Sequence, residues 1–155
     1  MDKRDAVSAE QRVIAYWNDG ADDYIRGMPG TNPEEERVAW RKELERVLPP
    51  PPAELVDLGT GPGFMALLAA ELGHRVRGIE SSEAMLARAR SEAERLGLPV
   101  VFEEGSALDP PGAPDSCDAV ICRNLFWLLA EPERTLAASF RLLRAGGRLA
   151  IFDVL

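Results

Sequence analysis

The chain has 155 residues, a length typical of one domain. Hydrophobic residues make up 46% of the chain, enough to bury a core, so global disorder is excluded. The formal net charge is −8, and such a surface repels polyphosphates, so nucleic acid is not an expected partner.

The cysteines and the N-terminus narrow the class of protein further. Cys117 and Cys122 are too few for a disulfide framework, and their spacing lacks the paired ligands of a zinc site. The charged N-terminus has no apolar stretch behind it, and no segment approaches the roughly 18 apolar residues of a membrane span. We expect a cytoplasmic protein that holds no metal and contacts no membrane.

Four consecutive prolines, residues 49–52, divide the chain, because proline cannot extend a helix. Before them, helical periodicity predicts helices at residues 8–18 and 34–48. The segment between these helices is rich in glycine and turn formers and is expected to be a loop.

After the prolines, short apolar runs alternate with helical patterns. Strands are predicted at residues 54–58, 75–79, 99–103, 118–122 and 148–154. Helices are predicted at residues 63–72, 82–96 and 131–143. This alternation indicates an α/β domain with a parallel sheet, whose ligand binds at the carboxyl ends of the strands.

The segment VDLGTGPGF, residues 56–64, is the most informative. It leaves a strand, turns through Gly59, Gly61 and Gly63, and enters a helix whose free N–H groups suit an anionic group. The dinucleotide pattern G-x-G-x-x-G would require glycine where Phe64 stands. A purely structural turn remains open on the glycines alone.

Glu80 follows the glycine loop by about 20 residues, at the end of the second predicted strand. A carboxylate at this place can accept hydrogen bonds from both hydroxyls of a ribose. As a lone residue it could equally be an acid favoured at a helix start. Together with the glycine loop, it favours a site for an adenosine-containing ligand.

These residues resemble the class I S-adenosylmethionine-dependent methyltransferases that act on small molecules. VDLGTGPGF resembles the first motif of the family, Glu80 its ribose-binding acid, FEEGSALDPP its adenine segment, and residues 118–153 its fourth and fifth strands. The resemblance implies a doubly wound, mostly parallel Rossmann-like sheet of strand order 3-2-1-4-5, with helices on both faces. Residues 1–48 would form a helical lid over a core of residues 53–155.

The resemblance also implies the residues that contact S-adenosylmethionine. They are Tyr24, Asp57, Gly59, Thr60, Gly61, Gly63, Glu80, Ser81, Met85, Ser106, Ala107, Leu108, Arg123 and Asn124. Asp57 and the glycines would surround the methionine part, Glu80 the ribose, and residues 106–108 the adenine. Family members often carry an acid where Ser106 stands; serine is a weaker, neutral acceptor, and a plain loop role for it stays open.

The function implied is in-line methyl transfer to a small-molecule acceptor, driven by alignment and exclusion of water. No histidine base or nucleophilic triad lies among the motif positions, so no catalytic residue is assigned. A cofactor-binding module without catalysis is the alternative, and a nicotinamide-dependent oxidoreductase a weaker one. The strands that usually complete the family fold are absent, so we expect a truncated chain whose exposed fifth strand forms a homodimer.

Three expectations concern residues outside the motifs. Trp40 is expected to pack in the core rather than to cover a cofactor. His74, at a helix end, is expected to be structural, in a place that favours a partly charged imidazole. The side chains of Arg134, Arg141, Arg144 and Arg148 are expected to form a solvated face.

Overall fold

A computed structural model describes residues 3–25 and 33–153 of the chain, with side chains for residues 9–20 and 33–153. Its strands are β1 (Glu54–Leu58), β2 (Arg75–Glu80), β3 (Val101–Glu104), β4 (Cys117–Arg123) and β5 (Leu143–Phe152). Its helices are α1 (Lys3–Ile25), α2 (Pro33–Val47), α3 (Phe64–Glu71), α4 (Glu83–Leu96) and α5 (Pro132–Leu142), with a short 3-10 turn, η1 (Phe126–Leu128).

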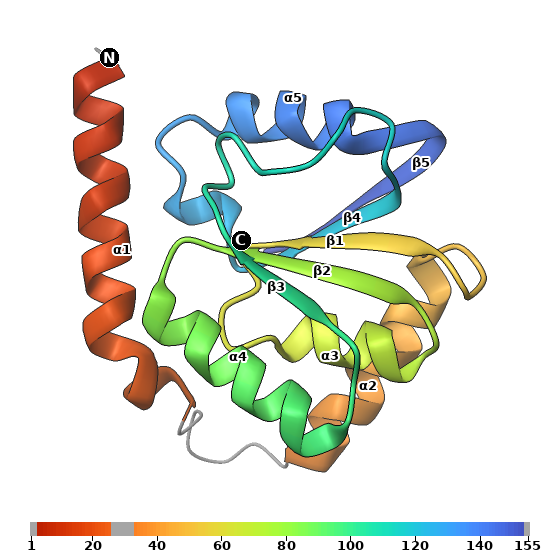
Figure 1. The fold of residues 1–155 in the computed structure, drawn as a ribbon. Helices are drawn as coiled ribbons and strands as arrows, with labels where there is room; N and C mark the ends of the chain where they lie inside the picture. The colour runs from red at the N-terminus through yellow and green to blue at the C-terminus, as the bar shows by residue number, and fades with distance from the viewer. Residues whose placement is uncertain (1–2, 26–32, 154–155) are drawn as a thin grey trace.

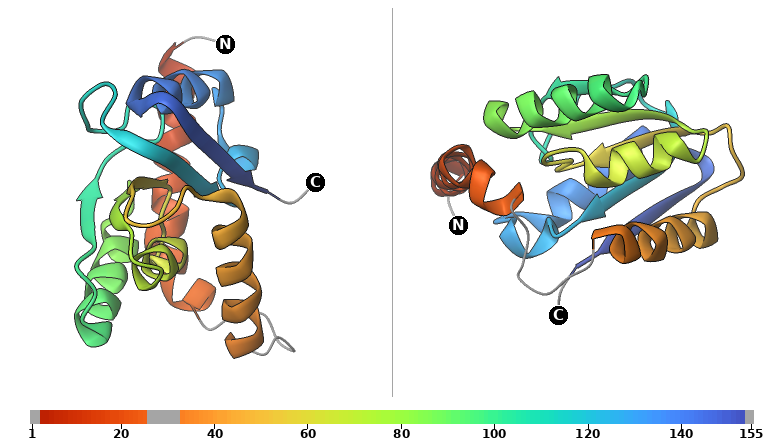
Figure 2. Two further views of the ribbon diagram at one scale, coloured as in Figure 1. Left: turned by 90° about the vertical axis from the view of Figure 1, so that its right-hand side faces the viewer. Right: turned by 90° about the horizontal axis from the view of Figure 1, so that it is seen from below.

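The strands form one sheet in the order β3-β2-β1-β4-β5, and every neighbouring pair is parallel. This is the order predicted above, and the α/β fold is confirmed. Helices α2, α3 and α4 cover one face of the sheet and α5 covers the other (Figures 1 and 2). Because β1 and β4 are buried on both faces, their sequences are near-continuous apolar runs.

The two faces of the sheet bury separate apolar clusters. Leu44 of α2, Leu68 of α3 and Leu86 of α4 are fully buried in the larger cluster. Leu142 of α5 is fully buried in the smaller one. Since α2 supplies buried core residues, it belongs to the sheet's own helix layer, whereas α1 runs past the carboxyl ends of the strands (Figure 1).

Element boundaries differ from the prediction where local signals are weak. Helix α1 continues through Gly20 to Ile25, so the predicted loop begins too early; a single glycine costs a helix only about 1 kcal/mol. Strand β3 starts at Val101 rather than at Pro99, which has no N–H to donate. Strand β5 begins at Leu143 instead of residue 148. Its pairing with β4 has an irregularity between Cys117 and Ala119, so the strand can include Gly146 and Gly147.

The environments of Trp40 and His74 are now defined. The Trp40 ring packs edge-on against Phe152 at 5.2 Å between centroids and contacts the larger cluster, as predicted. His74 is 7% exposed, and burial lowers the pKa of its imidazole. The expectation of a partly charged imidazole is therefore wrong, because desolvation outweighs the pull of the helix end.

The described residues contain no group of three metal-ligating side chains, and both Cys117 and Cys122 are buried free thiols. Burial raises the pKa of Cys117 to about 11, which keeps the thiol protonated at neutral pH. No helix within residues 3–25 and 33–153 combines the length and apolar character needed to cross a bilayer.

Of the four arginines predicted to form a solvated face, Arg141, Arg144 and Arg148 form hydrogen bonds with distant parts of the chain. Arg141 donates to the carbonyls of Gly112 and Pro110, at 2.7 and 2.8 Å. Arg144 pairs with Asp118 at 2.8 Å. The fourth, Arg134, lies 3.8 Å from Glu131, three residues before it in the same turn of the chain. Sequence spacing does not show such partners, because they are distant along the chain.

Arg148 closes the carboxyl end of α2, since its Nη1 donates to the carbonyls of Val47 and Leu48 at 3.0 and 3.2 Å. Arg148→Ala is expected to lower the free energy of unfolding by about 1 kcal/mol, because the last carbonyls of α2 lose a charged donor. Urea denaturation measures this change. The matched control, Arg134→Ala, should shift stability by less than about 0.5 kcal/mol, and equal losses would contradict the capping role.

Candidate functional site

A cavity of about 330 Å³ lies at the carboxyl ends of the strands, a size typical of small-molecule sites. It sits where the chain leaves β1 for β2 on one side and β4 for β5 on the other, the switch point at which open α/β sheets bind ligands. Predicted site residues that line the cavity are Asp57, Gly59, Thr60, Gly61, Glu80, Ser81, Met85, Ala107, Leu108, Arg123 and Asn124. Of the predicted residues whose side chains the structure describes, Gly63 and Ser106 are not part of the lining.

Two glycines of the loop stand at positions where a side chain would not fit. Gly59 has φ +65°, and an added Cβ would stand 2.8 Å from Leu125 Cδ1. Gly63 has φ +90° and is the N-cap of α3, where a Cβ would stand 3.0 Å from the Phe102 ring. Gly63 therefore allows the start of α3 to pack closely against the sheet. Gly59 allows Leu125, which lines the cavity, to lie close to the loop.

Asp57 is buried beneath the loop, with 2% of its surface exposed. Its carboxylate accepts the Thr60 hydroxyl at 2.7 Å and the backbone N–H of Ala66, in the first turn of α3. Burial raises the pKa of Asp57 to about 7; the two hydrogen bonds and the charge of Arg123 oppose the rise, and the charge of Glu80 adds to it. The site thus holds a carboxyl group that titrates near neutral pH.

Glu80, the last residue of β2, joins the glycine loop to the start of α4. Its Oε2 accepts the N–H of Gly61 at 2.9 Å. Its Oε1 accepts the N–H groups of Ser81 and Ser82, at 2.9 and 3.0 Å. An ionised carboxylate has about four acceptor positions, so Oε2 keeps one for a ligand in the cavity.

Arg123 ends β4 and lies between two aromatic rings. Its guanidinium carbon is 4.9 Å from the Trp40 ring centroid and 4.7 Å from that of Phe64, and its Nη2 lies 3.5 Å from Glu36. The Phe64 ring thus contacts the Arg123 guanidinium, and glycine, which a dinucleotide motif has at this position, would remove that contact. The next residue, Asn124, adopts φ +53°, which asparagine tolerates.

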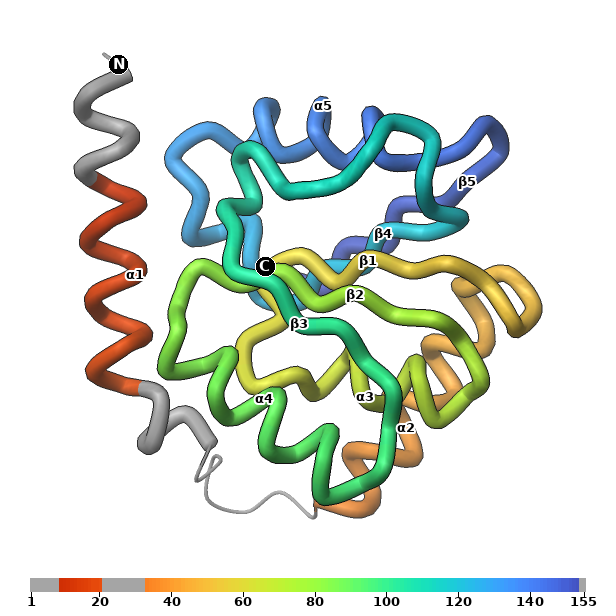
Figure 3. The backbone as a smooth tube through the Cα atoms, in the orientation of Figure 1, coloured from red at the N-terminus to blue at the C-terminus, as the bar shows by residue number. Residues whose placement is uncertain are grey.

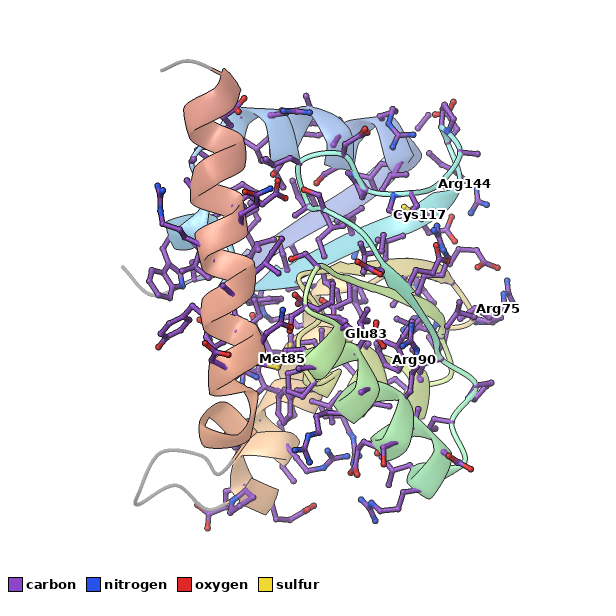
Figure 4. All side chains as sticks on the ribbon, turned by 60° about the vertical axis from the view of Figure 1, so that its left-hand side comes forward. Arg75, Glu83, Met85, Arg90, Cys117 and Arg144 are labelled. Carbon is purple, nitrogen blue, oxygen red and sulfur yellow. The ribbon has the colours of Figure 1, made fainter. Side chains whose placement is uncertain are left out.

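Ser106 lies behind the cavity wall. Its Oγ accepts the N–H of Leu108 at 3.1 Å and donates to a carboxylate oxygen of Glu10 in α1. Met85 is 2% exposed at the end of α4 that faces α1, whereas Cys117 and Arg144 lie at the far end of the strands (Figure 4). The predicted contact of Tyr24 lies outside the described side chains.

Helix α1 supplies a cavity wall whose acidic member the sequence analysis missed. Glu10, Val13, Ile14 and Trp17 all line the cavity. Their spacing of i, i+3, i+4 and i+7 is one helical face, so the helical periodicity of residues 8–18 places Glu10 on the same face as the three apolar residues. Asn18 anchors the same helix, because its Oδ1 accepts the hydroxyl of Ser82, the N-cap of α4, at 2.6 Å. Figure 3 shows α1 running beside α4.

The turn after β4 completes the apolar wall. Trp127, Leu128 and Leu129, within and after η1, line the cavity, and Trp127 remains 60% exposed. The backbone before this turn is fixed to the end of β5, since Asn124 N–H donates to the Phe152 carbonyl at 2.8 Å and Leu125 N–H donates to Asp153, the next residue, at 2.9 Å.

Comparisons with known proteins agree with this geometry. A family described as "Methyltransferase domain" matches residues 56–151, more than half of the chain. The chain belongs to the class I S-adenosylmethionine-dependent methyltransferases. The match begins within β1 and ends within β5, so it contains the glycine loop, Glu80 and Arg123.

Relatives of this methyltransferase include quinone-modifying proteins. A demethylmenaquinone methyltransferase of Thermus thermophilus is 37% identical over 75% of this chain and 54% of its own length. A ubiquinone biosynthesis O-methyltransferase of Thiobacillus denitrificans is 35% identical over 61% of this chain and 41% of its own. A methyltransferase structure from Aquifex aeolicus has a TM-score of 0.70 at 23% identity, over 79% of this chain and 68% of that one, a likeness of fold. The chain spans about half the length of the curated relatives it matches.

Proposed function

We propose that this chain binds S-adenosylmethionine in the cavity at the carboxyl ends of its strands and transfers the methyl group to a small molecule. The observation that carries the proposal is Glu80, whose carboxylate is fixed by three backbone N–H groups and keeps a free acceptor position at the cavity. A ribose hydroxyl is a suitable donor for that position. Asp57, buried beside it, suits the amino group of a methionine moiety.

The side chains around Glu80 fit the remaining parts of this cofactor. Met85 and Leu108 offer apolar contact for a purine ring, and Ser81 adds a hydroxyl. The bound cofactor supplies a methyl group on a sulfonium, whose departure leaves a neutral thioether. The chain contributes alignment and exclusion of water through the apolar faces of α1 and of the turn after β4.

We propose an apolar small molecule as the methyl acceptor. The names of the two curated relatives point to quinone precursors, and the wall formed by Ile14, Phe64, Trp127 and Leu128 suits an apolar ring. Among the described residues that line the cavity none is a histidine, so no general base is assigned. Two buried free thiols suit the reducing cytoplasm, which is part of the proposal.

Calorimetric titration with S-adenosylmethionine, S-adenosylhomocysteine and NAD tests the binding step. We expect binding of the first two and none of NAD; binding of NAD alone would overturn the proposal. Incubation with the methyl-labelled donor and a panel of quinol and phenol acceptors tests turnover. Tight cofactor binding without labelled product across the panel would favour the alternative, a cofactor-binding module without catalysis.

Self-association through β5 remains a prediction. Among the described strands β5 lies at an edge of the sheet and pairs with β4, and its Ile151 is 42% exposed. An edge strand with apolar side chains favours pairing with a second copy. Light scattering should show a dimer, and Ile151→Lys should shift it to monomer. A monomeric wild-type chain at high concentration would contradict the prediction.

A further inference from the structure

The cavity has an acidic group at its β3 end that the proposed function does not use. The lining follows the sheet order, from Arg123 at the end of β4, past Asp57 in β1 and Glu80 in β2, to Leu108 after β3. With the methionine part beside Asp57 and the ribose on Glu80, the adenine ring extends toward the β3 end. Glu10 supplies the carboxylate there, and it comes from α1 rather than from the sheet.

Glu10 lines the cavity together with three apolar residues of the same helix, Val13, Ile14 and Trp17. A face that only packed against the core would gain more from a fourth apolar residue, since a half-buried carboxylate loses hydration. An acid at this place is therefore explained better by partners that donate hydrogen bonds: the Ser106 hydroxyl is one, and a ligand in the cavity can supply a second. The 6-amino group of adenine is such a donor.

The carboxylate of Glu10 is oriented rather than free. Ser106 Oγ accepts the Leu108 N–H, which turns its own hydrogen toward Glu10 Oε1. One hydrogen bond of this kind leaves Glu10 Oε2 as an acceptor. Asn18, two turns further along α1, accepts the Ser82 hydroxyl and so fixes the helix at a second point.

We propose that Glu10 of α1 accepts a hydrogen bond from the 6-amino group of the cofactor's adenine, with Ser106 as the residue that positions it. This inference rests on the proposed function. Helix α1 would then select cofactors that carry adenine, and the bound adenine would contact both α1 and the sheet. Ser106, a weak acceptor on its own, acts through the acid it holds.

The test compares S-adenosylhomocysteine with an analogue whose purine carries hydrogen in place of the 6-amino group. The wild-type chain should bind the amino form about tenfold more tightly, as expected for a charge-assisted hydrogen bond. Glu10→Ala should bring the ratio of the two dissociation constants close to one, and Glu10→Gln, a neutral acceptor, should give an intermediate ratio. Asp19→Ala, which removes an exposed acid from the same helix, should leave the ratio unchanged.

A rescue variant separates recognition from simple docking of α1. Adding Ser106→Asp to Glu10→Ala should restore the preference for the amino form, because the acid then comes from the loop after β3. A wild-type ratio in Glu10→Ala overturns the proposal, and so does a wild-type chain that binds both compounds equally. If Glu10→Ala binds neither, a wild-type ratio in Glu10→Gln overturns it. Failure of the wild-type chain to bind S-adenosylhomocysteine counts against the proposed function instead.

Discussion

Replacement of Glu80 by glutamine is expected to weaken binding of S-adenosylhomocysteine by about a hundredfold. The carboxylate accepts hydrogen bonds on every side, from Gly61, Ser81 and Ser82 in the described structure and from the ribose in the proposed complex. A glutamine must direct its NH₂ group at one set of these donors. Hydrogen bonds to a charged group contribute about 1.5–3 kcal/mol each, and 1.4 kcal/mol is a factor of ten in affinity.

The same variant should also be less stable, by about 1–3 kcal/mol, because backbone N–H groups at the loop lose an acceptor. Calorimetry with S-adenosylhomocysteine measures the first effect, and urea denaturation measures the second. The matched control is Glu104→Gln, since Glu104 pairs with Glu80 across β2 and β3 but is exposed. Wild-type affinity in Glu80→Gln would mean that the ribose is held elsewhere.

The sheet and half of the site were predictable because their signals are local. The central strands β1 and β4, of five and seven residues, are mostly apolar, and Gly59, Gly61 and Glu80 stand at fixed places relative to strand ends. The parallel sheet then brings those ends together, so residues far apart in sequence meet without any pairwise signal.

The remaining half depends on contacts between distant segments. Glu10 meets Ser106 across 96 residues, and Arg123 lies between rings from α2 and α3. Periodicity shows which residues share a helix face but not what that face meets. The prediction ended α1 too early because Gly20 indicated a turn, whereas the helix continues through this glycine.

The second large effect is expected from Asp57→Asn, which should remove a fall in stability between about pH 4 and pH 7. Burial raises the pKa of Asp57 from 3.8 to about 7 in the folded chain. Between these values the folded chain keeps a proton that the unfolded chain has released, so the free energy of unfolding decreases as pH rises. Above pH 7 both states are ionised, and the slope disappears. Asparagine cannot titrate.

Urea denaturation at half-unit intervals from pH 4 to pH 8 measures this effect as a difference between wild type and variant. The difference should change by up to about 4 kcal/mol across the window, since each unit of pKa shift corresponds to about 1.36 kcal/mol. Asp118→Asn is the control, and its difference from wild type should stay constant from pH 4 to pH 8. The Glu54 N–H and Arg144 lower the pKa of Asp118, so its contribution is present at neutral pH and lost only on acidification below the ordinary value.

The titration of Asp57 also connects stability to the proposed cofactor. A bound ammonium group beside Asp57 favours the ionised carboxylate and lowers its pKa, so binding below pH 7 must release a proton. The heat of S-adenosylhomocysteine binding at pH 6 should therefore depend on the ionisation enthalpy of the buffer in the wild-type chain, and much less in Asp57→Asn. Identical buffer dependence in both chains would remove Asp57 from the cofactor's surroundings. The buried acid thus lowers the stability of the ligand-free fold at neutral pH, and the cofactor's positive charge offsets that loss.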